Sequence, residues 1–139
     1  METNAPSPPY GIAPPGFRLP PGTGVGAVRL QVADLGRSLD WYEAVLGLRT
    51  LTRSDGEATL GAREDDGALV ELRERPGARP APPRGRLGLF HFAILLPDRA
   101  ALGRFVGHLS GLGVSAGASD HRVSEALYLR DPDGLGIEV

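Results

Sequence analysis

Two residues near the end of the chain have side chains suited to metal chemistry. His91 lies within the apolar run 89–96, and Glu138 lies within the apolar-rich segment 135–139. Burying an imidazole or a carboxylate without a partner is costly, so each of these side chains needs one. Because Fe(II), Mn(II), Zn(II) and Ni(II) all accept nitrogen and carboxylate ligands, a single divalent metal would satisfy both.

The composition of the 139-residue chain describes one globular domain and removes several kinds of chemistry. With 41% apolar residues and a formal net charge of −2, the chain has no electrostatic reason to bind nucleic acid or an anionic membrane. All fifteen cations are arginine and cysteine is absent, which excludes lysine Schiff bases, thiolate nucleophiles and disulfides. No apolar run is long enough to span a bilayer, and no secretion signal is recognisable. We therefore expect a cytoplasmic protein.

Proline divides the chain into an arm and two halves. Seven of the thirteen prolines lie within the first 21 residues, so residues 1–23 are predicted to form a flexible or strap-like arm. A second proline-rich stretch, 76–86, is predicted to be a linker between residues 24–75 and residues 87–139. The sequence thus predicts one module, 24–139, built from two units.

The first unit has the pattern of a strand, a helix and three strands. Val28, Leu30 and Val32 alternate with other residues at the period of a half-buried strand. Asp34 is a suitable cap for the following helix and Gly47 a suitable end. The apolar stripe of that helix consists of Leu35, Leu39, Tyr42, Val45 and Leu46. Strand-like runs then follow at 48–53, 57–62 and 68–73.

The second unit repeats this order. A strand at 89–96 precedes Asp98 as the helix cap, and Gly111 and Gly113 mark the end of the helix. Its predicted apolar stripe consists of Leu102, Phe105, Val106, Leu109 and Leu112. Further strands are predicted near Val114, at 125–130 and at 135–139. The sequence therefore predicts an α+β protein with a duplicated βαβββ unit, in which two four-stranded sheets pair to enclose a cavity.

Three segments carry a resemblance to a known family. They are VADLGRSLDWY at 32–42 with VLGL at 45–48, GASDHRVSEALY at 117–128, and YLRDPDGLGIE at 128–138. With these motifs, residues 24–139 resemble the vicinal oxygen chelate superfamily of glyoxalases, bleomycin resistance proteins and extradiol dioxygenases. The segment 117–128 is most similar to the N-terminal module of bacterial proteins like catechol 2,3-dioxygenase. The resemblance implies a curved mixed sheet around a cavity.

The resemblance also implies where a metal would bind. Family members hold it at up to four equivalent places, on the first and last strands of each unit. In the second unit these places fall on His91 and Glu138, and in the first on Ala27 and Glu71. Alanine cannot ligate a metal, so the implied ligands are His91, Glu138 and Glu71.

Each of these residues also has an ordinary structural interpretation. His91 would be a core histidine bonded to backbone, Glu138 a solvated side chain near the terminus, and Glu71 part of a charged strand face. Two further residues, Arg29 and Tyr128, are candidates for the same cavity. Arg29 either binds an anionic substrate or pairs with Glu71 or Glu138, and Tyr128 either lines the cavity or packs in the core.

Three other motifs are expected to be structural. His121 lies in an Asp-His turn, where polar side chains commonly bond local backbone. His108 is expected on the exposed side of its helix. The segment 131–134, Asp-Pro-Asp-Gly, has the composition of a β-turn.

The resemblance leaves three functions open. The first is a metal-dependent enzyme of the glyoxalase or dioxygenase type, in which Glu138, Arg29 and Tyr128 act on a substrate with two neighbouring oxygens, such as a catechol or a hemithioacetal. The second is a metal-free binding protein of the bleomycin-resistance type, which Ala27 favours. The third is an incomplete half of a two-module dioxygenase. A complete one-module protein is expected to form a homodimer.

Overall fold

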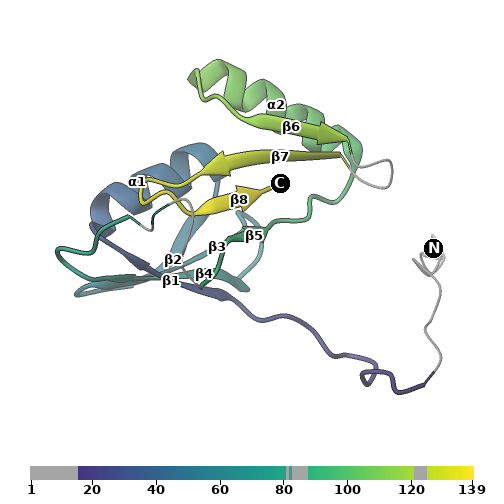
Figure 1. The fold of residues 1–139 in the computed structure, drawn as a ribbon, viewed down its shortest axis with the longest axis horizontal. Coiled ribbons are helices and arrows are strands. Elements are labelled where there is room, and N and C mark those ends of the chain that lie inside the picture. The colour runs from purple at the N-terminus through teal and green to yellow at the C-terminus, as the bar shows by residue number, and fades with distance from the viewer. Residues whose placement is uncertain (1–15, 81, 83–87, 121–124) are drawn as a thin grey trace.

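The chain forms two consecutive βαβββ units, as the sequence predicts (Figure 1). The computed structural model describes residues 16–80, 82, 88–120 and 125–139. The first unit comprises β1 (Val28–Val32), α1 (Leu35–Leu46), β2 (Arg49–Ser54), β3 (Glu57–Gly61) and β4 (Ala68–Glu74). The second comprises β5 (His91–Ala93), α2 (Arg99–Leu112), β6 (Gly117–Asp120), β7 (Glu125–Arg130) and β8 (Gly136–Glu138). No helix among the described residues is long and apolar enough to cross a membrane.

Both helices begin and end where the capping residues predict. The carboxylate of Asp34 accepts a hydrogen bond from the Arg37 amide at 2.8 Å, and that of Asp98 accepts one from the Ala101 amide at 2.7 Å. Gly47 and Gly113 end the two helices with φ of 70° and 68°. Only glycine adopts this left-handed backbone at no steric cost, so it fixes the end of each helix.

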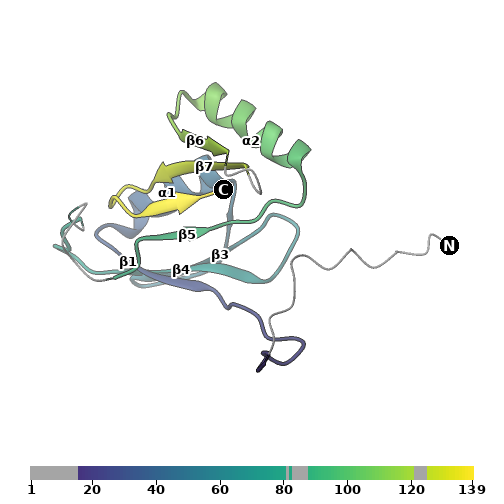
Figure 2. The same ribbon diagram turned by 45° about the vertical axis from the view of Figure 1, so that its right-hand side comes forward.

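The first and last strands of each unit lie side by side. The sheet orders are β1-β4-β3-β2 and β5-β8-β7-β6. The pairs β1–β4 and β5–β8 are parallel, and the other neighbours are antiparallel. The two sheets remain separate and do not close into a barrel, and β5 lies between β8 and the first sheet (Figures 1 and 2). This topology brings side chains from the two ends of each unit together.

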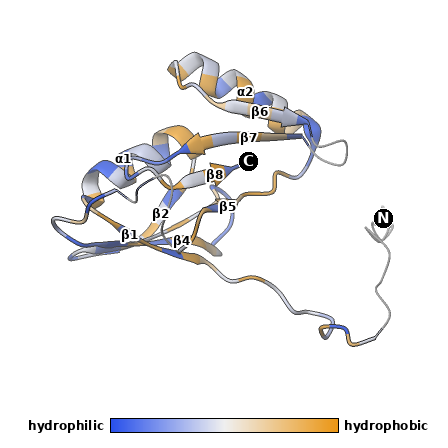
Figure 3. Ribbon diagram, in the orientation of Figure 1, coloured by the Kyte–Doolittle hydropathy of each residue, from blue (hydrophilic) through white to orange (hydrophobic). Residues whose placement is uncertain are grey.

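One hydrophobic core joins the two units. In the first unit, α1 covers one face of its sheet (Figure 3). Leu60 and Leu72 are almost completely buried there. Leu109 on α2, Leu129 on β7 and Ile137 on β8 belong to the same core. Successive strand residues point to opposite faces, so each sheet also has an open face on which alternate residues are exposed.

The turn between β7 and β8 docks on α1. The Asp133 carboxylate accepts a hydrogen bond from the Ala33 amide at 2.8 Å and forms an ion pair with Arg37. Beside it, the Tyr42 hydroxyl donates a hydrogen bond to Asp131 at 3.1 Å, and both side chains are buried. The predicted β-turn at 131–134 is confirmed by a hydrogen bond of 2.9 Å from the Gly134 amide to the Asp131 carbonyl.

Three details of the second unit differ from the sequence prediction. The strand predicted near Val114 begins three residues later, as β6 at Gly117, because the Val114 amide is hydrogen-bonded to the Leu109 carbonyl as part of the helix end. The strand predicted at 89–96 is limited to three residues, because within the described part of the chain it pairs only with β8, which is itself three residues long. On α2, Leu109 alone is buried, while Val106 and Leu112 are about half exposed.

Candidate active site on the open face of the second sheet

His91 and Glu138 lie together on the open face of the second sheet. In the parallel pair β5–β8, the residue paired with Glu138 is Ala93, and His91 lies two residues earlier on the same face of β5. The Nε2 atom of His91 is 3.3 Å from Oε2 of Glu138. Both side chains are accessible, with exposed fractions of 41% and 26%. The structure therefore brings these two predicted site residues into one cluster.

Tyr128 completes this cluster. It is the antiparallel partner of Glu138 across β7 and β8, so the two side chains share a face. Partial desolvation, together with the negative charge and hydrogen bonding of Glu138, raises the pKa of the Tyr128 phenol. A raised pKa keeps the phenol protonated over a wider pH range and available as a hydrogen-bond donor. Tyr128 was expected either to line the cavity or to pack in the core, and the structure places it on the open face, outside the core.

Exposed apolar side chains lie next to His91. Ala93 shares the open face of β5 with His91, whereas Leu95 lies beyond the end of β5 and lines a separate hollow with Asp98. Leu89 and Phe90 are also exposed, and the Phe90 ring contacts the His91 ring edge to face at a centroid distance of 5.5 Å. A few polar groups within an apolar surface is the usual character of a small-molecule site.

Gly136 is a site residue that the sequence argument missed. It is the strand partner of His91, and a Cβ atom added to it would lie 2.9 Å from His91 Cβ and 3.0 Å from the Phe90 carbonyl oxygen. Neither contact involves a flexible side-chain end, so only glycine fits. A glycine within a predicted strand is the signal that could have revealed this close backbone approach.

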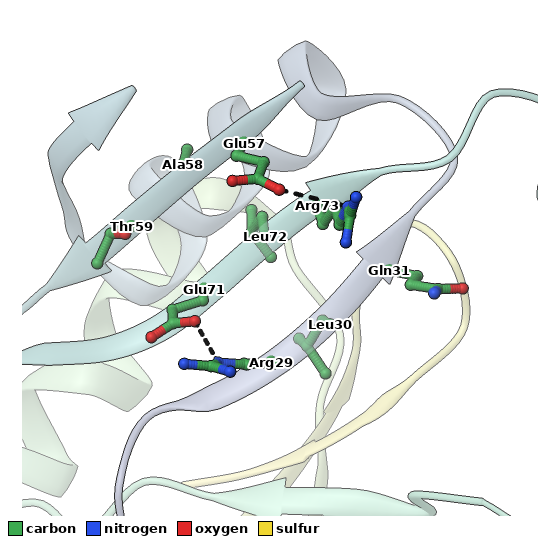
Figure 4. Close-up of a pocket in the computed structure, with 9 residues that line it drawn as sticks. All are labelled: Arg29, Leu30, Gln31, Glu57, Ala58, Thr59, Glu71, Leu72 and Arg73. Atoms are coloured by element: carbon green, nitrogen blue, oxygen red, sulfur yellow. Dashed lines mark hydrogen bonds and ion pairs between the residues drawn. The ribbon is translucent and has the colours of Figure 1, made fainter. Parts of the chain in front are cut away.

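The open face of the first sheet is polar, in contrast. This face has a hollow of about 480 Å³ (Figure 4). Its polar lining consists of Arg29 and Gln31 on β1, Glu71 and Arg73 on β4, and Glu57 and Thr59 on β3. The Nε atom of Arg29 is 2.5 Å from Oε2 of Glu71, and that of Arg73 is 3.3 Å from Oε1 of Glu57. Of the alternatives for Arg29, the structure shows the ion pair with Glu71.

The two units hold their basic residue at different positions along the first strand. Arg29 is paired directly with Glu71 in β1–β4, whereas the residue paired with Glu138 in β5–β8 is Ala93. The basic residue of the second unit, His91, lies two residues earlier, at the position that Ala27 has in the first. The sequence Ala-Val-Arg in one unit thus corresponds to His-Phe-Ala in the other.

Glu71 does not join His91 and Glu138. Among the described residues, no three His, Cys, Asp or Glu side chains are grouped closely enough to hold one metal ion. Of the three predicted metal ligands, the structure therefore brings together two, and the role of all three as ligands stays a prediction. His108 is exposed, as predicted, and its Nε2 atom is 2.8 Å from the Ala44 carbonyl oxygen. His121 lies outside the described residues.

Comparisons with known proteins point to one family. The profile of the Glyoxalase/Bleomycin resistance protein/Dioxygenase superfamily matches residues 24–139. The catechol-2,3-dioxygenase of Bacillus subtilis (strain 168) is 46% identical over 117 residues. That match covers 84% of this chain but only 41% of the relative, so the chain spans about two fifths of the relative's length.

Solved structures share the fold. A lactoylglutathione lyase from Agrobacterium tumefaciens superposes with a TM-score of 0.66 at 22% identity, covering 86% of this chain and 94% of the other. A glyoxalase/dioxygenase from Nostoc punctiforme superposes with a TM-score of 0.69 at 23% identity, covering 88% of this chain and 94% of the other. These likenesses show the fold, and the profile that matches residues 24–139 shows that the chain belongs to the Glyoxalase/Bleomycin resistance protein/Dioxygenase superfamily.

Proposed function

We propose that the chain is a metal-dependent enzyme, or an enzyme module, of the glyoxalase/dioxygenase type. Its substrate would be a small molecule with two neighbouring oxygens, such as a catechol or a hemithioacetal. The observation that carries the proposal is the approach of His91 Nε2 to Glu138 Oε2 at 3.3 Å on an accessible sheet face. The 46% identity to a protein named catechol-2,3-dioxygenase supports the dioxygenase branch.

The two side chains fit one divalent metal. Two ligands of a single tetrahedral or octahedral ion, each about 2.1 Å from it, lie about 3.0–3.4 Å apart. The separation of 3.3 Å between His91 Nε2 and Glu138 Oε2 agrees with this range. An imidazole nitrogen and a carboxylate oxygen suit Fe(II), Mn(II), Zn(II) and Ni(II). His91 and Glu138 would thus hold the metal, and Glu71 would need to leave Arg29 before it took part.

The candidate site residues on the two sheets have separate tasks in this proposal. A bound metal would supply Lewis acidity to the two substrate oxygens. Glu138 is the carboxylate that accepts a substrate proton, and Tyr128, with its raised pKa, is the phenol that donates a hydrogen bond to a substrate oxygen. Arg29 would bind an anionic substrate group after exchanging its partner Glu71. The Phe90 ring, which contacts the His91 ring, would lower the exposure of the reacting groups to water.

The Arg29–Glu71 ion pair favours a second candidate function. Glu71 already has a cationic partner in the absence of metal, and Ala27 offers no ligand atom. A metal-free protein that sequesters a small planar ligand on its open sheet faces is consistent with both facts. In that case a ligand would bind equally well in the presence and absence of a chelator. A metal-dependent enzyme would lose its substrate affinity when the metal is removed.

Metal analysis separates the two candidates. Purified protein is loaded separately with Fe(II), Mn(II), Ni(II) and Zn(II), freed of unbound metal, and its bound metal is measured by mass spectrometry. We expect at least one of these ions to be retained at about one per chain, and His91→Ala to weaken its binding about 10-fold or more. His108→Ala, which removes a histidine that contacts the Ala44 carbonyl on α1, is the matched control. Retention below about one ion per two chains for every metal would reject the enzyme.

A further inference from the structure

Charges on the open face of the first sheet follow a regular order. Across β1, β4 and β3, one row of paired residues reads Arg29, Glu71 and Thr59, and the next row reads Gln31, Arg73 and Glu57 (Figure 4). The two rows are two residues apart along each strand, so all six side chains share one face. The charged groups therefore form a zigzag of alternating sign, and the two neutral side chains, Gln31 and Thr59, occupy opposite corners of the hollow.

Basic groups surround the corner at Gln31. Arg29 precedes Gln31 by two residues on β1, and Arg73 is its partner on β4. Arg75 donates a hydrogen bond of 3.3 Å from Nη1 to the side-chain oxygen of Gln31. A guanidinium has five N–H donors, so its contact with one protein group leaves donors for a further carboxylate. The Gln31 corner is therefore suited to an anionic group.

Acidic groups flank the opposite corner, at Thr59. Glu57 precedes Thr59 by two residues on β3, and Glu71 is its partner on β4. A cation above Thr59 would have a carboxylate on each of these two sides, and the Thr59 hydroxyl can accept a hydrogen bond from it as well. The Thr59 corner is therefore suited to an ammonium group.

The ion pairs on this face leave both corners accessible. The pair Arg29–Glu71 and the pair Arg73–Glu57 involve side chains that are between 35% and 81% exposed. Exposed ion pairs are weak, because water and salt screen them, so the charged groups of a ligand can compete for the same side chains. The volume of the hollow, about 480 Å³, lies within the usual range of small-molecule sites.

We propose that the hollow binds an elongated zwitterion of the ω-amino acid type, with its carboxylate at the Gln31 corner and its ammonium group at the Thr59 corner. The corners are two strand spacings and two residues apart, which is about 12 Å between backbone positions. Each ligand charge lies between a corner and its charged neighbours, so the two charges should be about 8–10 Å apart. A singly charged ligand would satisfy one corner and place an apolar end at the other. The hollow does not include His91 or Glu138, so this binding does not depend on the metal proposed there.

A series of amino acids of increasing length measures the distance between the corners. The whole chain, freed of metal and chelator and kept at low ionic strength, is titrated calorimetrically with glycine, 4-aminobutanoate, 6-aminohexanoate and 8-aminooctanoate. We expect the 6- or 8-carbon compound to bind at least about 10-fold more tightly than glycine, and about 10-fold more tightly than hexanoate or hexylammonium, which carry one charge each. Equal affinity along the series, or no binding of any compound at about 10 mM, would overturn the proposal.

Charge deletions at the two corners should have different effects. Arg75→Gln should weaken the binding of both hexanoate and 6-aminohexanoate about 5-fold or more, because both carry a carboxylate. Glu57→Gln should weaken 6-aminohexanoate but not hexanoate, which has no ammonium group. Both residues are exposed, so the variants should fold, and circular dichroism checks this. Arg99→Gln, which breaks an exposed ion pair of the second unit, is the matched control.

The pattern of these effects decides the proposal. If Arg75→Gln and Glu57→Gln bind 6-aminohexanoate as the Arg99→Gln control does, the ligand does not occupy the two corners. Amide chemical shifts give an independent location, because ligand in the hollow should perturb β1, β3 and β4. Shifts centred on His91 and Glu138 would place the ligand on the second sheet and reject the hollow as its site.

Discussion

The hydroxyl of Tyr42 on α1 donates a hydrogen bond to the buried carboxylate of Asp131, 89 residues further along the chain. Asp131 also accepts hydrogen bonds from the amides of Asp133 and Leu135, at 2.9 and 2.8 Å. One carboxylate thus ties the first helix to the turn before β8, the strand that carries Glu138. Burial, followed by the charge and hydrogen bond of Asp131, strongly raises the pKa of Tyr42, so the phenol remains a donor.

Removing the Tyr42 hydroxyl should destabilise the chain. Tyr42→Phe keeps the buried ring but leaves one oxygen of Asp131 without its donor, and we expect a loss of about 1–3 kcal/mol in the free energy of unfolding. Chemical denaturation measures this change. Tyr128→Phe is the matched control, because Tyr128 lies on the open face and its loss should cost less than about 0.5 kcal/mol. Equal effects of the two variants would contradict this role of Tyr42.

The buried carboxylate should make stability depend on pH. Burial is the largest cause of the raised pKa of Asp131, so the native state binds this proton more tightly than the unfolded chain does. The contribution of Asp131 to stability is therefore greatest below its ordinary pKa of 3.8 and is lost as the pH rises through the raised value. Compared with Asp131→Asn, the wild type should gain stability as the pH falls from neutrality toward 4. A constant difference between the two proteins across that range would show that burial does not affect this group.

Gly136 should control the position of His91. The Cβ atom of Gly136→Ala would lie 2.9 Å from His91 Cβ, so β5 and β8 must move apart. We expect a loss of about 1–3 kcal/mol in stability and weaker metal binding than in the wild type. Titration of the folded variant with Zn(II) or Fe(II) measures the second effect. Gly103→Ala is the matched control, because a Cβ atom at that position of α2 would contact nothing within 4 Å.

A histidine at the equivalent position should give the first unit metal-binding ability like that expected of the second. Ala27→His places an imidazole at the position equivalent to His91, and we expect it to tighten metal binding. In combination with Arg29→Ala, which releases Glu71 from its ion pair, the increase should be larger, because a carboxylate then becomes available as a second ligand. Isothermal titration with each metal compares the single and double variants. If neither variant changes metal affinity, residue 27 does not lie in the same register as residue 91.

Sequence alone predicts most of the fold, because its signals are local. Asp34 and Asp98 with Gly47 and Gly113 define both helices, and their equal spacing from the first strands reveals the duplication. The length of β5 could not be predicted, since it depends on the three residues of its distant partner β8. The start of β6 was missed because the end of α2 uses the Val114 amide.

Some features of the candidate site can likewise be predicted from the sequence, and others cannot. The proximity of His91 and Glu138 follows from the pairing of first and last strands, which the family resemblance implies. The sequence does not decide whether Glu71 binds a metal or pairs with Arg29, because a strand pattern does not show which cation is closer. The hydrogen bond between Tyr42 and Asp131 is invisible in a helical stripe, where the tyrosine looks like any apolar residue. Its hydroxyl, which needs a partner when buried, was the available signal.

The exchange of Ala-Val-Arg for His-Phe-Ala between the two units has a chemical consequence. A guanidinium has no lone pair to give a metal, and beside Glu71 it keeps that carboxylate occupied as a counter-ion. A neutral imidazole has such a lone pair, so the glutamate beside His91 has a neighbour that can coordinate the same ion. The two repeated units are therefore chemically unequal: the glutamate of the first unit is neutralised by a cation, and the glutamate of the second lies beside a possible ligand nitrogen.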